Sequence, residues 1–277
     1  MKKFKKVMIA NRGEIAIRII RACHELGIRT VAIHSKEDKY ALFRTKSDES
    51  YLVGSSKGPI EAYLGIDEII DIALKKGVDA IHPGYGFLSE NPEFSRKCEE
   101  AGIVFIGPSP EMMESLGDKI KSKIVAKNAG VPIIMGIDKP ITNDDEAVQC
   151  AAEWGYPVML KASAGGGGRG MRIVHNSDQL IPEFHNARNE ARKAFGREDI
   201  FIEKYLESPK HIEVQIIADN YGNTLHLFER DCSIQRRHQK VVEFTPAFSL
   251  SPEKRLQICN DALKIARAVN YRNAGTA

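Results

Sequence analysis

The sequence predicts an α/β fold with a doubly wound, mostly parallel sheet, followed by a smaller unit and by antiparallel strands. Short apolar segments alternate with helical segments over roughly the first hundred residues, and this alternation is typical of parallel sheets. Further along, a run of glycines joins two apolar segments, as in a hairpin with few side chains at its tip. Residues 212–218 then alternate apolar and polar side chains with the period of two that half-buried antiparallel strands show.

The first part of the chain is predicted to contain a βαβ unit and two further strands, each of which follows a helix. The helices repeat apolar residues at helical spacing, and glycines stand directly after them, in the position that is typical of a helix end. The predicted strands cover residues 6–10, 30–34, 80–81 and 104–106, and the predicted helices cover residues 14–26, 67–76 and 92–101.

Two loops leave the carboxyl ends of predicted strands, where ligands bind in doubly wound folds. Asn11-Arg12-Gly13 follows the first strand, and residues 82–87 (H-P-G-Y-G-F) follow the third. Each loop is a candidate ligand loop, but a proline and two glycines also form an ordered turn at low cost. The spacing of the residues leaves both interpretations open.

A long helix and a compact segment follow Pro108. The helix is predicted over residues 111–129 and carries four lysines, which usually form a solvated face. The compact segment covers residues 131–202 and includes a mostly exposed helix over residues 177–195. Because a small unit that is joined to a larger body at both ends can move as one piece, we interpret this segment as a lid.

The glycine run lies between one apolar strand over residues 156–160 and a second over residues 171–174. Its four consecutive glycines, residues 165–168, can turn at positive φ and bring their N–H groups close to an anion. Lys161 and Arg169 add positive charge, so a nucleotide phosphate is the predicted ligand, and a flexible tip or linker is the alternative. The run is not a Walker loop, because no Gly-Lys-Ser/Thr follows it to open a helix.

Antiparallel strands are predicted in the last part of the chain. They cover residues 201–206, 212–218 and 225–229, and a terminal helix covers residues 251–268. An unusually polar block, residues 230–240 (R-D-C-S-I-Q-R-R-H-Q-K), follows directly on the last strand. A solvated loop is one interpretation of this block, but the density of hydrogen-bond donors and cations favours a binding site.

Composition and charge narrow the class of protein. With 277 residues, 43% of them apolar and 28% charged, the chain is typical of globular proteins and has the length of about two domains. The net charge of +3 is too small to predict nucleic-acid binding. Five widely spaced cysteines without a C-x-x-C pair favour reduced thiols. Because no apolar segment is long enough for a signal peptide or a membrane span, we expect a cytoplasmic protein without a membrane partner.

Seven stretches of this sequence, in the order in which they occur, resemble the biotin carboxylase family of the ATP-grasp superfamily. They cover the chain from end to end, and the set is far more specific than any one of its members. The stretches are residues 9–16 (I-A-N-R-G-E-I-A), 82–91 (H-P-G-Y-G-F-L-S-E-N), 117–119 (G-D-K), the glycine run, 203–206 (E-K-Y-L), 211–215 (H-I-E-V-Q) and 229–243 (E-R-D-C-S-I-Q-R-R-H-Q-K-V-V-E).

The resemblance implies a division into four segments. A Rossmann-like domain with a parallel sheet covers residues 1–112, and a connecting helix covers residues 113–130. An ATP-grasp lid with the glycine-rich flap covers residues 131–202, and an incomplete antiparallel α+β ATP-grasp core covers residues 203–277.

The resemblance also implies a ligase that forms a C–N bond. MgATP or MnATP and bicarbonate form carboxyphosphate, and its CO2 passes to N1 of biotin in the first half-reaction of a biotin-dependent carboxylase. The implied partners are a biotin carboxyl carrier protein or domain, a carboxyltransferase, and a second copy in a homodimer of the full-length protein. The final acceptor stays open between acetyl-CoA, propionyl-CoA and pyruvate; acetyl-CoA would place the protein in fatty acid biosynthesis.

Site residues follow from the resemblance, position by position. Lys240 is assigned to bicarbonate, and Lys240 and His238 are the expected catalytic residues. Lysine suits phosphate and small anions, because its ammonium group is a compact point charge. Cys232 is not assigned, since an unpaired cysteine is more often a small buried residue. The residues assigned to ATP binding are Lys119, Lys161, Gly167, Gly168, Glu203, Lys204, Leu206, His211, Gln235 and His238.

The sequence departs from the pattern of the family at three places. Ala164 stands where another glycine is common, and Thr245 precedes Pro246 where the family usually has alanine. The sequence also ends at Ala277, before the strand that carries the first metal-binding glutamate of the family. The resemblance therefore implies no metal ligand within this chain and no carboxylation by this chain alone.

Two other functions remain open from the sequence. A non-catalytic nucleotide-binding or assembly module is the first, and the missing carboxylates keep it open. Another ATP-grasp ligase, which joins a carboxylate to an amine, is the second. The polar block with Gln235, His238 and Lys240 argues against this ligase.

Overall fold

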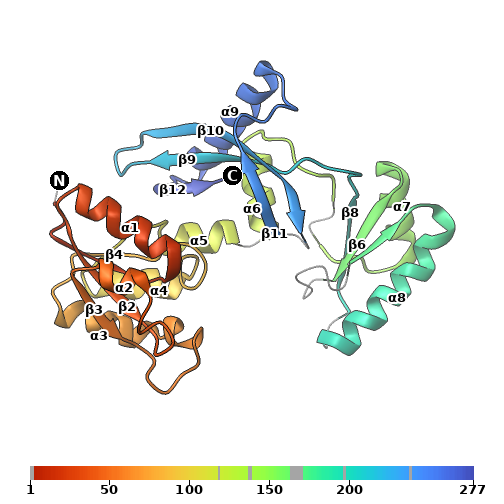
Figure 1. Ribbon diagram of the computed structural model, residues 1–277. Helices are drawn as coiled ribbons and strands as arrows, with labels where there is room; N and C mark the ends of the chain where they lie inside the picture. Colours follow the sequence, from red (N-terminus) through yellow and green to blue (C-terminus); the bar gives the residue numbers. More distant parts are fainter. Residues whose placement is uncertain (1–2, 118, 137–138, 163–170, 196–197, 237–238) are drawn as a thin grey trace. The chain divides into compact units, whose positions relative to one another are not determined.

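The computed structural model describes residues 3–117, 119–136, 139–162, 171–195, 198–236 and 239–277, and it contains three sheets (Figure 1). One sheet is parallel with the order β3-β2-β1-β4-β5, and the other two have the orders β7-β6-β8 and β11-β10-β9-β12. An α/β fold with a parallel sheet and antiparallel strands is thus confirmed. The chain divides into two compact units, Met1–Val125 with Gln215–Leu227 and Asn260–Ala277, and Ala126–Val214 with Phe228–Cys259.

The parallel sheet is covered on both of its faces, as a doubly wound fold requires. Neighbouring residues of its central strand β1 belong to different apolar clusters, with Met8 in one cluster and Ile9 in the other. Its strands are β1 (Lys6–Ile9), β2 (Arg29–His34), β3 (Glu49–Leu52), β4 (Ala80–His82) and β5 (Val104–Phe105). Its helices are α1 (Gly13–Glu25), α2 (Leu42–Lys46), the 3-10 helix η1 (Glu61–Leu64), α3 (Ile66–Lys75), α4 (Pro92–Glu100) and α5 (Pro110–Gly117).

The helix predicted over residues 111–129 is found as the two described helices α5 and α6 (Lys119–Asn128). Residue 118, which lies between them, is outside the described residues, so the single continuous helix stays a prediction.

Asn11 ties the two loops at the carboxyl end of the parallel sheet to each other. Its side-chain amide donates to the carbonyl oxygens of Pro83 at 2.6 Å and Tyr85 at 2.9 Å. Gly84 lies at a φ of +67°, and a Cβ atom there would be 2.6 Å from the Asn11 amide nitrogen. His82 is occupied as well, since its Nδ1 accepts from the Gly84 N–H at 3.0 Å. The two loops that the sequence left open therefore form a mutually hydrogen-bonded pair.

A buried carboxylate, Asp38, is held at the same end of the sheet. The guanidinium of Arg12 donates to both of its oxygens at 2.6 Å, and the hydroxyl of Tyr63 donates at 2.7 Å. The hydrogen bonds from Arg12 keep the pKa of Asp38 below its ordinary value. Because this pKa is lowered by folding, the carboxylate stabilises the fold above its unfolded pKa and loses this effect as the pH falls through the folded pKa.

We therefore expect Asp38→Asn to destabilise the parallel-sheet unit at pH 7 by about 2 kcal/mol, the size of a charge-assisted hydrogen bond. The difference from the unchanged protein should shrink as the pH falls below about 4, because the unfolded carboxyl is protonated there and the folded carboxyl at lower pH still. Hydrogen exchange of the β1 and β2 amides as a function of pH measures this. Asp71→Asn, at an exposed carboxylate of α3, is the control and should leave exchange almost unchanged. A difference that stays constant with pH would refute the role of the charge.

The hairpin predicted around the glycine run is confirmed in its strands. β6 (Val158–Ala162) pairs antiparallel with β7 (Met171–Val174), and β8 (Ile200–Lys204) pairs with the other edge of β6. The tip, residues 163–170, lies outside the described residues. The helix predicted over residues 177–195 is confirmed as α8 (Ser177–Phe195), which packs with α7 (Asp144–Trp154) and the sheet around one apolar core.

The third sheet contains the polar block. The strand predicted over residues 225–229 continues through residues 230–236 of that block as the long strand β10, and residues 239–240 belong to β11. These parts of the block lie in a sheet and not in a solvated loop. The predicted strand over residues 201–206 is shorter than expected, because β8 ends at Lys204. The elements are β9 (Ile212–Ala218), β10 (Thr224–Arg236), β11 (Gln239–Phe244), α9 (Pro252–Ala268) and β12 (Asn273–Thr276). Among the described residues, the structure has no helix with the length and apolarity of a membrane span.

Candidate functional site

Lys161 of β6 is bound by the carboxylate of Glu203 from the neighbouring strand β8. Met159 is the register partner of Glu203, so Lys161 lies diagonally across from it on the same face. Such diagonal neighbours are within reach of long side chains. The side chains of Lys161 and Glu203 keep 35% and 20% of their surface exposed, so this predicted phosphate ligand faces partly toward solvent.

Lys204 uses its side chain to hold the turn before β6. Its ammonium group donates to the carbonyl oxygens of Gly155 at 3.0 Å and Tyr156 at 2.9 Å. Its backbone N–H donates to the carbonyl oxygen of Met135 at 2.8 Å. Leu206 lies beyond the end of β8 and is 46% exposed. Lys204 therefore supports the geometry of this strand, and Leu206 leaves an apolar side chain open to contact.

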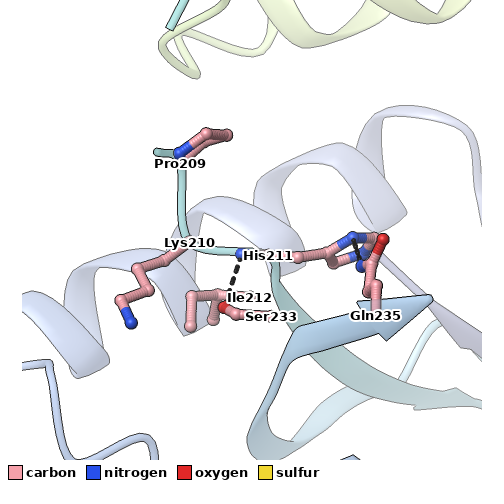
Figure 2. A pocket seen from close by; sticks show the side chains of 6 residues that line it. All are labelled: Pro209, Lys210, His211, Ile212, Ser233 and Gln235. Atoms are coloured by element: carbon pink, nitrogen blue, oxygen red, sulfur yellow. Dashed lines mark hydrogen bonds between the residues drawn. The ribbon is translucent and has the colours of Figure 1, made fainter. Parts of the chain in front are cut away.

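His211 and Gln235 line a shallow pocket of about 380 Å³, together with Pro209, Lys210, Ile212 and Ser233 (Figure 2). The side-chain amide nitrogen of Gln235 lies 2.9 Å from Nδ1 of His211 and donates to the carbonyl oxygen of Cys232 at 2.8 Å. The backbone N–H of His211 donates to the hydroxyl of Ser233 at 2.9 Å. With the Gln235 amide as donor, Nδ1 of His211 accepts, and the proton of the neutral ring is carried by Nε2. The pocket thus holds a lysine and a directed N–H donor, which suit an anionic group.

Lys240 of β11 is bound to the buried carboxylate of Glu213 from β9. The side chain of Glu213 is only 8% exposed, and the Arg230 side chain of β10 holds its other oxygen, Oε1, through Nε at 2.7 Å. A second nitrogen of the same guanidinium lies 2.5 Å from that oxygen. Arg230 also approaches the more exposed Glu243, with Nε 3.6 Å from Oε2. Three adjacent strands therefore contribute one network of two cations and two carboxylates.

Both members of the Lys240–Glu213 pair are charged near neutral pH. Burial raises the pKa of Glu213, but the hydrogen bonds from Lys240 and Arg230 outweigh it, so the pKa lies below its ordinary value. Burial lowers the pKa of Lys240, but the hydrogen bond to Glu213 outweighs it and leaves the pKa raised. Lys240 is thus a permanent ammonium group that is still 35% exposed, as an anion-binding residue has to be.

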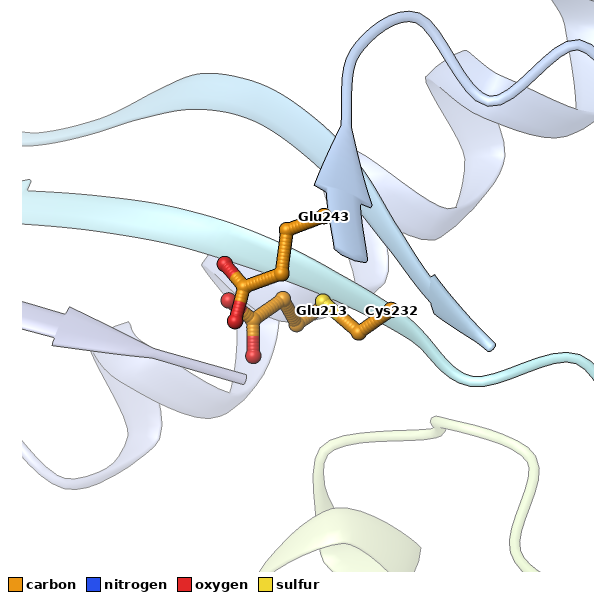
Figure 3. A group of neighbouring side chains, drawn as sticks. All are labelled: Glu213, Cys232 and Glu243. Atoms are coloured by element: carbon orange, nitrogen blue, oxygen red, sulfur yellow. The ribbon is translucent and has the colours of Figure 1, made fainter. Parts of the chain in front are cut away.

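Cys232 lies next to the same carboxylates (Figure 3). The thiol and the carboxylates of Glu213 and Glu243 have atoms that all lie within 4.8 Å of one another. Cys232 is fully buried, and burial raises the pKa of its thiol. Because both carboxylates already face Arg230, the group is better described as a charge network around a protonated thiol than as a cation site.

The structure brings three of the predicted site residues together. His211 contacts Gln235, and Gln235 is the register partner of Lys240 in the β10–β11 pair. Lys161, Glu203 and Lys204 lie on the β7-β6-β8 sheet. Gly167, Gly168 and His238 fall outside the described residues, and Lys119 lies in α6 with its side chain outside the description.

Glu213 and Arg230 belong to this site, although the sequence analysis assigned them no role. A glutamate between apolar residues of a predicted strand has to be paired if it is buried, because an isolated buried charge is very unfavourable. The sequence I-E-V in β9 and the cations of the polar block carried this signal. The pairing itself depends on the register of three strands and was not readable from spacing.

Two family models match this chain. The model of the biotin carboxylase N-terminal domain matches residues 3–113, and that of the carbamoyl-phosphate synthase L chain, ATP binding domain, matches residues 118–277. The chain is 58% identical to pyruvate carboxylase of Bacillus subtilis over 98% of this chain and 24% of that protein. It is 54% identical to human mitochondrial pyruvate carboxylase over 99% of this chain and 23% of that protein.

Solved structures are similar over the whole chain. The biotin carboxylase domain dimer of Hydrogenobacter thermophilus 2-oxoglutarate carboxylase, in complex with MgADP, ADP and bicarbonate, is 53% identical with a TM-score of 0.86. The match covers 100% of this chain and 60% of that one. The biotin carboxylase subunit of a pyruvate carboxylase is also 53% identical, with a TM-score of 0.82, over 99% of this chain and 60% of that one. These relatives are pyruvate and 2-oxoglutarate carboxylases, so the expected place in fatty acid biosynthesis is not supported.

Proposed function

Because the chain belongs to the biotin carboxylase family, we propose that it serves the ATP-dependent carboxylation of carrier-bound biotin with bicarbonate. The chain spans about a quarter of the length of the curated relatives it matches, 24% of the Bacillus protein, so the activity is proposed for the whole protein. One observation of the structure supports the reaction most directly. Gln235, proposed to contact ATP, is the register partner of Lys240, proposed to bind bicarbonate. The two reactants would therefore meet on neighbouring strands.

Four segments would carry this function. We propose a Rossmann-like domain over residues 1–112, a connecting segment over residues 113–130, a lid over residues 131–202 and a core over residues 203–277. The pairing of β6 with β7 supports a lid whose flap is presented by two strands. The Gln235–Lys240 register supports a core in which both anions bind to one sheet.

The nucleotide would bind through positive charge and directed donors. Lys161 carries a flexible ammonium group that can leave Glu203 for a phosphate, because the pair is partly solvated and such pairs contribute little net stability. His211 offers its Nε2 proton, and Glu203, Lys204 and Leu206 would border the adenine. Lys119, Gly167, Gly168, Gln235 and His238 complete the proposed ATP site.

Bicarbonate would bind at Lys240, with His238 as the second proposed catalytic residue. The fixed carboxylate of Glu213 orients the ammonium group of Lys240. The part of the Lys240 side chain that stays exposed would face the substrate. The role of Lys240 is to place the bicarbonate oxygen for attack on the γ-phosphate of ATP, so positioning is its main contribution.

A divalent metal accompanies ATP in the proposed reaction, and it would neutralise charge on the transferred phosphoryl group. Mg²⁺ prefers oxygen ligands in an octahedral arrangement. The group formed by Glu213, Cys232 and Glu243 does not fit this preference, because it includes a thiol and its carboxylates already face cations. We therefore assign no metal ligand among the described residues and derive no step through the metal.

The acceptor and the partners are inferred from the relatives. Pyruvate and 2-oxoglutarate, which their names contain, are both 2-oxo acids, so we propose a small 2-oxo acid as the final carboxyl acceptor. A biotin carboxyl carrier domain and a carboxyltransferase would take part, and the dimer of the Hydrogenobacter domain supports a homodimer.

Turnover tests the reaction as a whole. We expect the whole protein to release ADP only when both bicarbonate and biotin are present. Release of ADP that depends on an amine and not on bicarbonate would instead identify a carboxylate–amine ligase. Nucleotide binding without any turnover would identify a binding module.

Lys161→Gln tests the nucleotide site. We expect the affinity for ATP to fall about 10- to 100-fold, the loss of a charge-assisted hydrogen bond to phosphate. Calorimetric titration of the chain with ATP measures this. Lys139→Gln is the matched control in the same unit, because this lysine is 72% exposed and pairs with Glu146. Equal affinities for both variants would remove Lys161 from the site.

A further inference from the structure

Arg230 and Lys240 bind different oxygens of the buried Glu213 carboxylate. Arg230 binds Oε1 through two nitrogens, at 2.7 and 2.5 Å, and Lys240 binds Oε2. Two guanidinium nitrogens that converge on one oxygen hold that oxygen in place more firmly than a single ammonium donor does. The position of Oε2, and with it the position of the Lys240 ammonium group, therefore depends on Arg230.

The charge of Arg230 also changes what Lys240 can offer to an anion. Glu213 and Lys240 alone would sum to zero charge, and the ammonium would be largely neutralised by its own partner. Arg230 adds a positive charge, and its side chain is 29% exposed. Glu243 balances it only in part, because it lies 3.6 Å from Nε and its side chain is 40% exposed, so solvent screens it. Arg230 thus offsets part of the negative charge of Glu213 beside Lys240.

We propose that Arg230 is a positioning residue for bicarbonate: it holds Glu213 in place and offsets part of its charge, so that Lys240 presents a directed ammonium group that its partner neutralises only in part. Arg230 does not itself touch the substrate in this proposal. It rests on the proposed function, in which Lys240 binds bicarbonate. The same anion chemistry would apply to another small anion with one negative charge.

Arg230→Gln in the whole protein is the main test, with steady-state kinetics that vary bicarbonate and MgATP separately. We expect the KM for bicarbonate to rise about tenfold while the KM for MgATP stays within about twofold. The reason is that the positive charge is removed beside the bicarbonate site and not beside the nucleotide site. Arg230→Lys restores the charge but not the two-nitrogen contact. It should therefore recover part of the bicarbonate affinity.

A matched control separates positioning from stability. Arg255→Lys removes a comparable guanidinium from Glu229, a carboxylate on the same strand as Arg230. It should lower the melting temperature without changing the KM for bicarbonate. Arg230→Gln would be purely structural if it behaved in the same way, and the proposal would then be overturned.

Lys240→Gln separates the proposed role of Arg230 from the proposed function. If its KM for bicarbonate rises while that of Arg230→Gln does not, the role of Arg230 is wrong and the proposed function stands. If Lys240→Gln leaves the KM for bicarbonate unchanged, the proposed function itself fails. Should Arg230→Gln not fold, Arg230→Lys provides the decision: an unchanged KM for bicarbonate overturns the proposal, and a rise limited to bicarbonate supports it.

Discussion

Lys240→Gln is expected to reduce the turnover of the whole protein at low bicarbonate by about 10- to 150-fold, while leaving its affinity for MgATP nearly intact. The physical reason is the loss of a charge-assisted hydrogen bond to the substrate, which contributes about 1.5–3 kcal/mol. Glutamine keeps a donor of similar size, so the change isolates the charge. Buried Glu213 stays paired through Arg230, and the variant should therefore remain folded.

Biotin-dependent ADP formation at several bicarbonate concentrations measures this effect. Lys240→Arg restores the charge and should recover part of the turnover. Lys210→Gln serves as a comparison on the lining of the His211 pocket, where the expected loss is in ATP affinity. A Lys240→Gln variant that lost nucleotide affinity but kept its dependence on bicarbonate would show that the two anion sites have been exchanged.

Arg255→Ala is expected to lower the free energy of unfolding by about 3 kcal/mol, the lower end for buried ion pairs that lose one partner, because Glu229 is buried whereas the Arg255 side chain is 31% exposed. The carboxylate of Glu229 is completely buried, and Arg255 donates to its two oxygens at 2.7 and 2.6 Å. The backbone N–H of Ala247 donates to the same carboxylate at 2.9 Å. Without Arg255, a nearly uncompensated charge stays in the interior between β10 and α9.

Urea unfolding followed by the fluorescence of Trp154, the single tryptophan of the chain, measures this loss in the unit that contains both residues. Arg192→Ala is the control, because this arginine is 59% exposed and its pair with Glu198 is worth less than about 1 kcal/mol.

Burial raises the pKa of Glu229, and the hydrogen bond from Arg255 outweighs it in the unchanged protein. In Arg255→Ala the carboxyl of Glu229 should protonate more readily. The loss in free energy of unfolding relative to the unchanged protein should therefore be smaller at pH 5 than at pH 8. Similar losses for Arg255→Ala and Arg192→Ala would contradict this account.

The parallel sheet was predictable because each of its central strands is a short run of apolar residues. Burial on both faces gives such runs no polar alternation, and the helices between them end at glycines. Edge strand β3 escaped prediction because it is only half buried, and Glu49 and Ser50 interrupt its apolar character. Helix α7 escaped as well, although Asn143 caps it by accepting from the Glu146 N–H at 2.9 Å and acidic residues fill its first turn.

The candidate site was predictable only where single residues carry the chemistry. Lys161 was indicated by its place beside the glycine run, whereas Gln235 and Lys240 were assigned from the resemblance; the structure places Gln235 opposite Lys240. The Glu213–Arg230 contact joins residues 17 positions apart, and the Glu213–Lys240 contact joins residues 27 positions apart. Such pairs depend on strand register, which one sequence without its fold does not reveal.

The alternation of side chains along β6 limits how this part of the molecule can change in evolution. Val158, Leu160 and Ala162 are buried, whereas Met159 and Lys161 point to the other face. Because the faces of a strand alternate with every residue, the deletion of one residue inside β6 would turn Lys161 into the apolar core. A second deletion would return Lys161 to its original face. It would also move Lys161 by two residues along the strand relative to Glu203. The strand itself can therefore vary only by substitution if Lys161 is to keep its face and its place beside Glu203.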